Sequence, residues 1–124
     1  MMGGQLTVRV KTGPAHVLVT LAGNCDHSTG LEFRDGLATE VARGAQRLIV
    51  DLSEVGFMDS EAVHVLLDLK AVLTEWGGSL VLVNPQPIVA RVLSLMGADE
   101  VIPVADTVAE ALTLNQGAAP EGQV

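Results

Sequence analysis

Apolar and polar residues alternate along residues 5–10, which is the pattern of a strand with one buried face. Leu6, Val8 and Val10 share that face, and a polar turn at residues 11–14 follows. A second apolar run at residues 16–22 stops at Gly23. Because only a short turn separates the two runs, they predict an antiparallel hairpin at the start of the fold.

After Gly23 the apolar residues recur with the period of a helix. We expect this helix to run from Ser28 or Thr29, either of which can cap it, to about Ala45. Its inner face is predicted to consist of three apolar residues: Phe33, Leu37 and Val41. The charged residues are expected to lie elsewhere on the helix: Glu32, Asp35, Glu40 and Arg43.

A β-branched strand at residues 48–52 leads into a second helix that begins near Ser60. The inner face of this helix is predicted to hold Ala62, Leu66, Leu69, Leu73 and Trp76, and the outer face Glu61, His64, Asp68 and Glu75. Gly77 and Gly78 end it, and residues 79–84 form a buried strand. Strand, helix and strand in this order make a βαβ unit, so the sheet is at least partly parallel, with residues 48–52 and 80–83 in its interior.

The last third of the chain predicts two more helices around a short strand. Residues 85–87 open a helix at residues 88–96, and Gly97 stands at its C-terminal cap. The strand at residues 101–104 contains a proline, which restricts it to an edge or a strand end. Asp106 or Thr107 caps the final helix, which reaches Leu114. The remaining residues, 115–124, are small, polar and rich in Gly and Pro, so we expect a disordered tail.

Composition restricts the classes of function. The 124 residues are enough for one domain with a buried hydrophobic core. Hydrophobic residues make up 48% of them, yet no apolar run approaches the ~18 residues of a membrane span. Seven basic and 15 acidic residues give a net charge of −8 without any basic cluster, so direct binding of nucleic acid is not expected. The single Cys25 and the N-terminus, which lacks secretory-signal features, favour a cytoplasmic protein.

The junction between the strand at residues 48–52 and the next helix carries Asp59 and Ser60. Either side chain can cap the helix by accepting a hydrogen bond from a free N–H group of its first turn, and Glu61 suits the positive end of the helix dipole. A purely structural role is therefore one interpretation of this pair. Because a strand leads into a helix there, both side chains are expected at an exposed edge of the fold.

The segment from Asp51-Leu52-Ser53 to Phe57-Met58-Asp59-Ser60, continuing into an apolar helix, resembles the signature of the STAS domain of bacterial anti-sigma factor antagonists. Gly23 and Asp26 match a second family segment, in which Asn24 and Cys25 replace a Glu and a Leu. After Asp-Ser the family usually has Ser or Thr and then Gly, whereas this chain has Glu61 and Ala62.

The resemblance implies an α/β fold: a single STAS-like domain at residues 5–114, with a mixed sheet of four or five strands and about four helices. It also implies that the protein is an anti-sigma factor antagonist and not an enzyme. In that family the unmodified protein binds an ATP-dependent serine kinase that is also an anti-sigma factor, and the kinase then releases its sigma factor. Phosphorylation of the serine that corresponds to Ser60 switches this binding off. A non-switching STAS scaffold, or a subunit of a transport or stress-sensing assembly, is the alternative, and the sequence indicates no oligomeric state.

We expect the partner-binding surface where the two polar junctions follow their strands, and along the outer face of the helix after Ser60. Its predicted residues are Asp26, Asp59, Ser60, Glu61, His64 and Asp68. A Ser60–His64 nucleophile and base pair is disfavoured, because no Gly-x-Ser-x-Gly elbow and no orienting acid are present. A metal at Cys25, Asp26 and His27 is also disfavoured, since no second ligand cluster has a zinc-type spacing, and no cofactor is expected.

Overall fold

The computed structural model describes residues 5–117, with side chains for residues 5–114. Within this part of the chain the sheet has five strands: β1 (Leu6–Thr12), β2 (Val17–Cys25), β3 (Arg47–Met58), β4 (Ser79–Val83) and β5 (Val104–Ala105). Four α-helices accompany it: α1 (Gly30–Ala42), α2 (Ser60–Glu75), α3 (Pro87–Leu95) and α4 (Val108–Gly117). Two short 3-10 helices, His27–Thr29 and Ala98–Glu100, precede α1 and β5. The predicted α/β class and mixed sheet are therefore confirmed.

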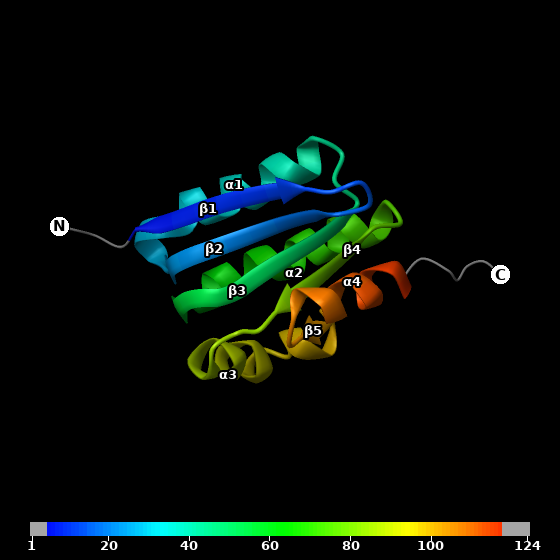
Figure 1. Cartoon of the computed structure of the whole chain (residues 1–124). Coiled ribbons are helices and arrows are strands. Elements are labelled where there is room, and N and C mark those ends of the chain that lie inside the picture. The colour runs from blue at the N-terminus through cyan, green and yellow to red at the C-terminus, as the bar shows by residue number, and fades with distance from the viewer. Residues whose placement is uncertain (1–4, 118–124) are drawn as a thin grey trace.

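The strands lie in the order β1-β2-β3-β4-β5 (Figure 1). Strands β1 and β2 form the predicted antiparallel hairpin, whereas every later neighbour pair is parallel. Val50 on β3 pairs with Val19 of β2 on one side and with Leu82 of β4 on the other. The two strands predicted to be internal, β3 and β4, are therefore inside the sheet, with β3 at its centre.

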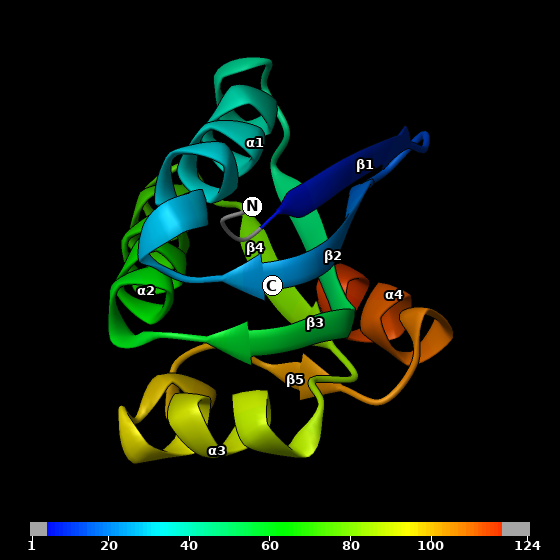
Figure 2. The same ribbon diagram turned by 90° about the vertical axis from the view of Figure 1, so that its left-hand side faces the viewer.

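Helices α1 and α2 cover one face of the sheet and α4 covers part of the other, while α3 lies beside the β5 edge (Figure 2). The larger apolar cluster lies on the side of α1, α2 and α3, and it includes the three leucines predicted to face inward: Leu66, Leu69 and Leu73. A smaller cluster packs between the sheet and α4: Ile49, Val81, Val83, Ala105 and Ala111. Burial of these side chains is the main source of stability for a domain of this size.

Strand boundaries differ from the prediction. Strand β1 continues to Thr12, and β2 continues through Gly23 to Cys25 instead of stopping there. Strand β3 continues to Met58 instead of ending near residue 52, and its pairing with β2 shifts register twice. The last strand is only Val104–Ala105, because the amides of Val101 and Ile102 donate to the carbonyl of Ala98 and close a turn there. These boundaries are set by backbone hydrogen bonds between strands and in turns, which periodicity does not reveal.

Helix ends and faces also depart in detail. Helix α4 reaches Gly117, three residues beyond its predicted end at Leu114, and the rest of the predicted tail lies outside the described residues. Trp76, predicted on the inner face of α2, is the C-cap residue and is 56% exposed. Glu40, predicted among the outward charges, is buried, and its Oε2 lies 3.5 Å from Nη1 of Arg43. Among residues 5–117, no helix is long and apolar enough to cross a membrane.

Candidate partner-binding site

The two polar junctions singled out in the sequence meet at one edge of the sheet. Strands β2 and β3 are parallel neighbours, and their last residues, Cys25 and Met58, are register partners. The backbone N–H of Asp59 donates to the carbonyl of Cys25 over 3.0 Å. This contact fixes the loop at Asp26 beside the turn at Asp59, at the carboxyl ends of the strands where open α/β sheets usually bind their ligands.

Asp59 caps helix α2. Its backbone is extended, with φ −95° and ψ 177°, and its Oδ1 accepts a hydrogen bond from the N–H of Ala62 over 2.9 Å. Ser60 is the first residue of the helix, and its side chain is exposed. Of the two residues that could have supplied the N-cap, Asp59 supplies it, and Ser60 remains exposed to solvent at the helix N-terminus.

Asp26 organises the neighbouring loop. Its Oδ1 accepts from the N–H of Ser28 over 2.9 Å and from the hydroxyl of Ser28 over 2.7 Å, while its own N–H donates to Oγ1 of Thr29 over 3.0 Å. The hydrogen bond from the Ser28 hydroxyl is the largest cause that lowers the pKa of Asp26, and the two backbone N–H groups add to it. Asp26, and not Ser28 or Thr29 as predicted, is the side-chain cap, and it caps the 3-10 helix that precedes α1.

Cys25 lies beneath these carboxylates. It is fully buried, and burial, with smaller contributions from the charges of Asp26 and Asp59, raises the pKa of its thiol to about 12. At neutral pH the thiol is therefore protonated and a poor nucleophile or metal ligand. Among residues 5–117, no three His, Cys, Asp or Glu side chains are grouped so that they could hold a metal ion.

A hollow of about 260 Å³ opens between the first turns of α1 and α2, and we call it the N-terminal hollow. Three of the predicted site residues line it: Asp26, Asp59 and Glu61. Asp68 is exposed farther along α2 and lines a separate hollow between the same two helices. The structure thus gathers four of the predicted carboxylates along the α1 and α2 side of the molecule.

Ser60 and His64 are both exposed and line neither hollow. In the described part of the chain no hydrogen bond joins their side chains, although they lie one helical turn apart. A nucleophile activated by a base needs that contact or a close approach to it. The geometry offers Ser60 as an accessible hydroxyl beside a negatively charged hollow.

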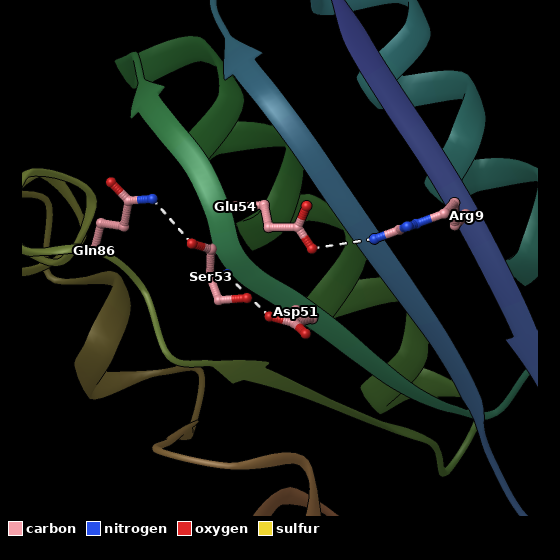
Figure 3. Close-up of polar contacts among 5 residues, drawn as sticks. All are labelled: Arg9, Asp51, Ser53, Glu54 and Gln86. Atoms are coloured by element: carbon pink, nitrogen blue, oxygen red, sulfur yellow. Dashed lines mark hydrogen bonds and ion pairs between the residues drawn. The ribbon is translucent and has the colours of Figure 1, made fainter.

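Two groups of contacts near the site have no signature in the sequence. On α1, Leu31 and Arg34 line the N-terminal hollow. On β3, the N–H of Ser53 donates to Oδ1 of Asp51, and Nε2 of Gln86 donates to the carbonyl of Ser53, each over 2.9 Å (Figure 3). These bonds satisfy the backbone at the first register shift of β3, so they set the path of the strand that leads to Asp59.

A salt bridge crosses the open face of the sheet near this bulge. Nη2 of Arg9 on β1 lies 3.1 Å from Oε2 of Glu54 on β3, with β2 between them (Figure 3). Both side chains are more than half exposed, at 61% and 53%. Exposed pairs of this kind contribute at most about 1 kcal/mol, so the contact does little to hold the hairpin.

Comparison with known proteins finds the STAS domain family over residues 6–111. A curated relative, the anti-sigma F factor antagonist of Paenibacillus polymyxa, is 28% identical over 98 residues, which are 78% of this chain and 84% of that protein. The match to a curated relative from Thermotoga neapolitana, 33% identical over 75 residues, spans 60% of this chain and 66% of that relative.

Solved structures give the same grouping. An anti-sigma factor antagonist from Mycobacterium paratuberculosis is similar over 90% of this chain and 95% of its own, with a TM-score of 0.83 and 26% identity. The anti-sigma factor antagonist SpoIIAA in its unphosphorylated form is similar over 90% and 97%, with a TM-score of 0.75 and 26% identity. SpoIIAA from Bacillus in its phosphorylated form shares the fold, with a TM-score of 0.67 and 24% identity.

Proposed function

This chain belongs to the STAS domain family, and from that premise we propose that it is a cytoplasmic anti-sigma factor antagonist controlled by phosphorylation of Ser60. In its unmodified form it binds an anti-sigma factor that is also an ATP-dependent serine kinase, and the bound anti-sigma factor releases its sigma factor. The kinase supplies the nucleotide and the metal ion. The protein itself acts by binding and carries out no catalysis.

The observation that carries this proposal is the placement of Ser60. Its hydroxyl is exposed at the first residue of α2, directly after Asp59, and beside the hollow lined by Asp26, Asp59 and Glu61. SpoIIAA has been solved in an unphosphorylated form, which is 26% identical to this chain, and in a phosphorylated form from Bacillus, which is 24% identical. An exposed serine at the same family motif is the natural acceptor for the corresponding modification here.

The proposed switch acts at the interface and not on the fold. A phosphate on Ser60 adds a charge of about −1.5 to −2 next to Asp59 and Glu61. The free N–H groups at the start of α2 stabilise part of that charge. When a partner excludes water from the surface at Ser60, however, the phosphate loses its hydration next to two carboxylates, so affinity falls where the partner places no cation beside Ser60.

Intact-mass measurement tests the proposal. The full chain is incubated with the purified cognate anti-sigma factor, ATP and Mg²⁺, and the added phosphate is mapped by peptide sequencing. The expected result is one phosphate on Ser60 for the native protein and none for Ser60→Ala. Ser60→Ala should still bind the anti-sigma factor, whereas Ser60→Asp should bind at least about tenfold more weakly. Phosphate on another residue, or none, would refute Ser60 as the switch.

The side chain of Glu61 favours a second candidate, a STAS scaffold that is not switched. Glu61 is exposed in the first turn of α2, next to Ser60, so it places a fixed negative charge beside the proposed phosphate. A scaffold would bind a constant partner with the same affinity before and after incubation with ATP. If Ser60→Asp and the native protein bind the partner equally well, this second function is the better one.

A further inference from the structure

Helices α1 and α2 lie side by side on one face of the sheet (Figure 2), and an open groove runs between them. Its first part is the N-terminal hollow. Its second part is a hollow of about 280 Å³, lined by Leu37 and Ala38 of α1 and by Asp68, Leu69 and Val72 of α2. Arg34 and Val65 line both hollows, so the two parts meet there. We call the whole the α1–α2 groove.

The floor of the α1–α2 groove is apolar, and apolar side chains also remain exposed along it. Phe33 and Leu37 are buried beneath it, at 1% and 0% exposure. Leu31, by contrast, is 71% exposed at one end of the groove, and Val72 is 38% exposed at the other. Exposed apolar side chains that surround an apolar hollow, with charged groups at its margin, are typical of a protein-binding surface.

The charge of the groove selects the kind of partner. Four carboxylates line its two hollows: Asp26, Asp59, Glu61 and Asp68. Arg34 is the one Lys or Arg side chain among the residues that line them. The chain as a whole carries a net charge of −8. A partner segment that fits this surface therefore needs apolar side chains for the floor and basic side chains for the margin.

We propose that the α1–α2 groove receives a basic amphipathic helix of the anti-sigma factor. Each wall of the groove consists of residues spaced three or four apart on one helix. They are Leu31, Arg34 and Ala38 on α1, and Val65, Asp68 and Val72 on α2. A helix laid between them inserts its apolar stripe and keeps its Lys and Arg side chains at the carboxylates, which is the helix-in-groove mode of recognition. This inference rests on the proposed function and adds α1 to the binding surface predicted from the sequence.

A matched pair of leucines tests the apolar contact. Leu31 is 71% exposed in the groove and Leu95 is 74% exposed on α3, so truncating either to alanine removes the same atoms from a similarly exposed position. Leu31→Ala is expected to raise the Kd for the purified anti-sigma factor about tenfold, and Leu95→Ala by less than about twofold. Circular dichroism of both variants checks that the fold is kept.

A second pair tests the space and the charge of the groove. Ala38 lines the groove and Ala109 lies on α4, on the opposite side of the sheet, and both side chains are exposed. Ala38→Arg fills the groove and repels a basic helix, so it should weaken binding more than about tenfold, whereas Ala109→Arg should not. Arg34→Ala removes the one Lys or Arg side chain that lines the groove, so it should raise the association rate constant about two- to threefold at low salt. High salt should abolish this difference by screening the charges.

The outcomes separate this inference from the proposed function. If the native protein binds the anti-sigma factor but Leu31→Ala and Ala38→Arg bind as well as their controls, the groove inference is overturned and the proposed function stands. If the native protein binds no anti-sigma factor, the proposed function itself fails. Amide hydrogen exchange in the complex gives an independent reading: protection of residues 31–38 on α1 supports the groove, and protection confined to residues 57–64 refutes it.

Discussion

Replacing Asp59 should reveal how much of the turn at the site is structural. Asp59→Ala removes the Oδ1 that accepts the N–H of Ala62 over 2.9 Å, and no neighbouring side chain replaces it in the described chain. Losing an N-cap of this kind costs about 1 kcal/mol, within a range of 0.5–2. Asp59→Asn keeps an oxygen in the same position and loses only the charge, so we expect less than about half of that cost.

Urea unfolding followed by far-ultraviolet circular dichroism measures this difference. Trp76 is 56% exposed in the folded protein, so its fluorescence is a weaker probe of unfolding. With a urea m-value of about 1–3 kcal/mol/M for a domain of this size, a loss of ~1 kcal/mol lowers the midpoint by about 0.3–1 M. The m-value itself should not change, because the surface exposed on unfolding stays the same.

Ser60→Ala is the decisive comparison for this prediction. Ser60 is exposed and does not cap α2, so its replacement should change the free energy of unfolding by less than about 0.5 kcal/mol. If Ser60→Ala destabilises the protein as much as Asp59→Ala does, the division of roles between the two residues is wrong. Equal losses for Asp59→Asn and Asp59→Ala would show that the charge, and not the hydrogen bond, stabilises the helix start.

Three further predictions concern two residues at the site and the turn that follows the C-terminal end of α2. The pKa of the Cys25 thiol is about 12 in the folded state against 9.0 for the free group, so the unfolded protein loses this proton at a lower pH than the folded protein does. The free energy of unfolding, measured by urea titration, should therefore fall by ~1 kcal/mol between pH 9 and pH 10. Cys25→Ala should not show this fall. Ser28→Ala removes the hydroxyl that is the main cause of the lowered pKa of Asp26, so the carboxyl group of Asp26 should titrate at a higher pH. Nuclear magnetic resonance of its carboxyl carbon measures this shift. An unchanged pKa would show that the Ser28 hydroxyl is not the cause. Gly78→Ala would place a Cβ against the carbonyl oxygen of Gln46, so the free energy of unfolding should fall by about 3 kcal/mol, with a lower Tm in thermal unfolding. An unchanged Tm would refute the contact.

The sheet and its central strands could be predicted from the sequence because their signals are local. Alternation defines β1, apolar runs define β2 and the first part of β3, and the spacing of Leu66, Leu69 and Leu73 defines the buried face of α2. A strand–helix–strand succession then leaves few parallel topologies to choose from. The patterns predicted the opening hairpin and the internal placement of β3 and β4, both of which the sheet shows, but not the full order of the strands.

Features that depend on contacts distant in sequence could not be predicted in this way. The continuation of β3 to Met58 passes through a bulge at Ser53, where the side chain of Gln86, 33 residues away along the chain, donates a hydrogen bond to the backbone. Glu40 has the spacing of an outward residue, yet it is buried at the end of α1 near the loop that leads to β3. Neither residue type nor periodicity carries information about such packing, because the neighbouring segments are fixed only when the whole domain folds.

The same distinction applies to the site. The motif identified Asp59 and Ser60, and parallel pairing of β2 and β3 placed Asp26 beside them as expected. Which of the two adjacent residues caps the helix was open, since both side chains can do so. The contribution of α1 was absent from the prediction, because Leu31 and Arg34 have the ordinary spacing of exposed helix residues and approach α2 only in the folded domain.

The separation of roles between Asp59 and Ser60 is compatible with a turn that is a structural element and also the switch that we propose. Asp59 commits its carboxylate to the N–H of Ala62, so the start of α2 does not depend on the hydroxyl of Ser60. A phosphate on Ser60 would therefore add charge without removing a hydrogen bond that holds the fold. Because the hydroxyl faces solvent beside Glu61 and the carboxylates of the N-terminal hollow, the added charge would be felt most strongly when a partner excludes water from that surface. If Ser60 is phosphorylated as we propose, a turn built in this way would keep the stability of the domain nearly independent of the phosphorylation state and would confine the response to binding.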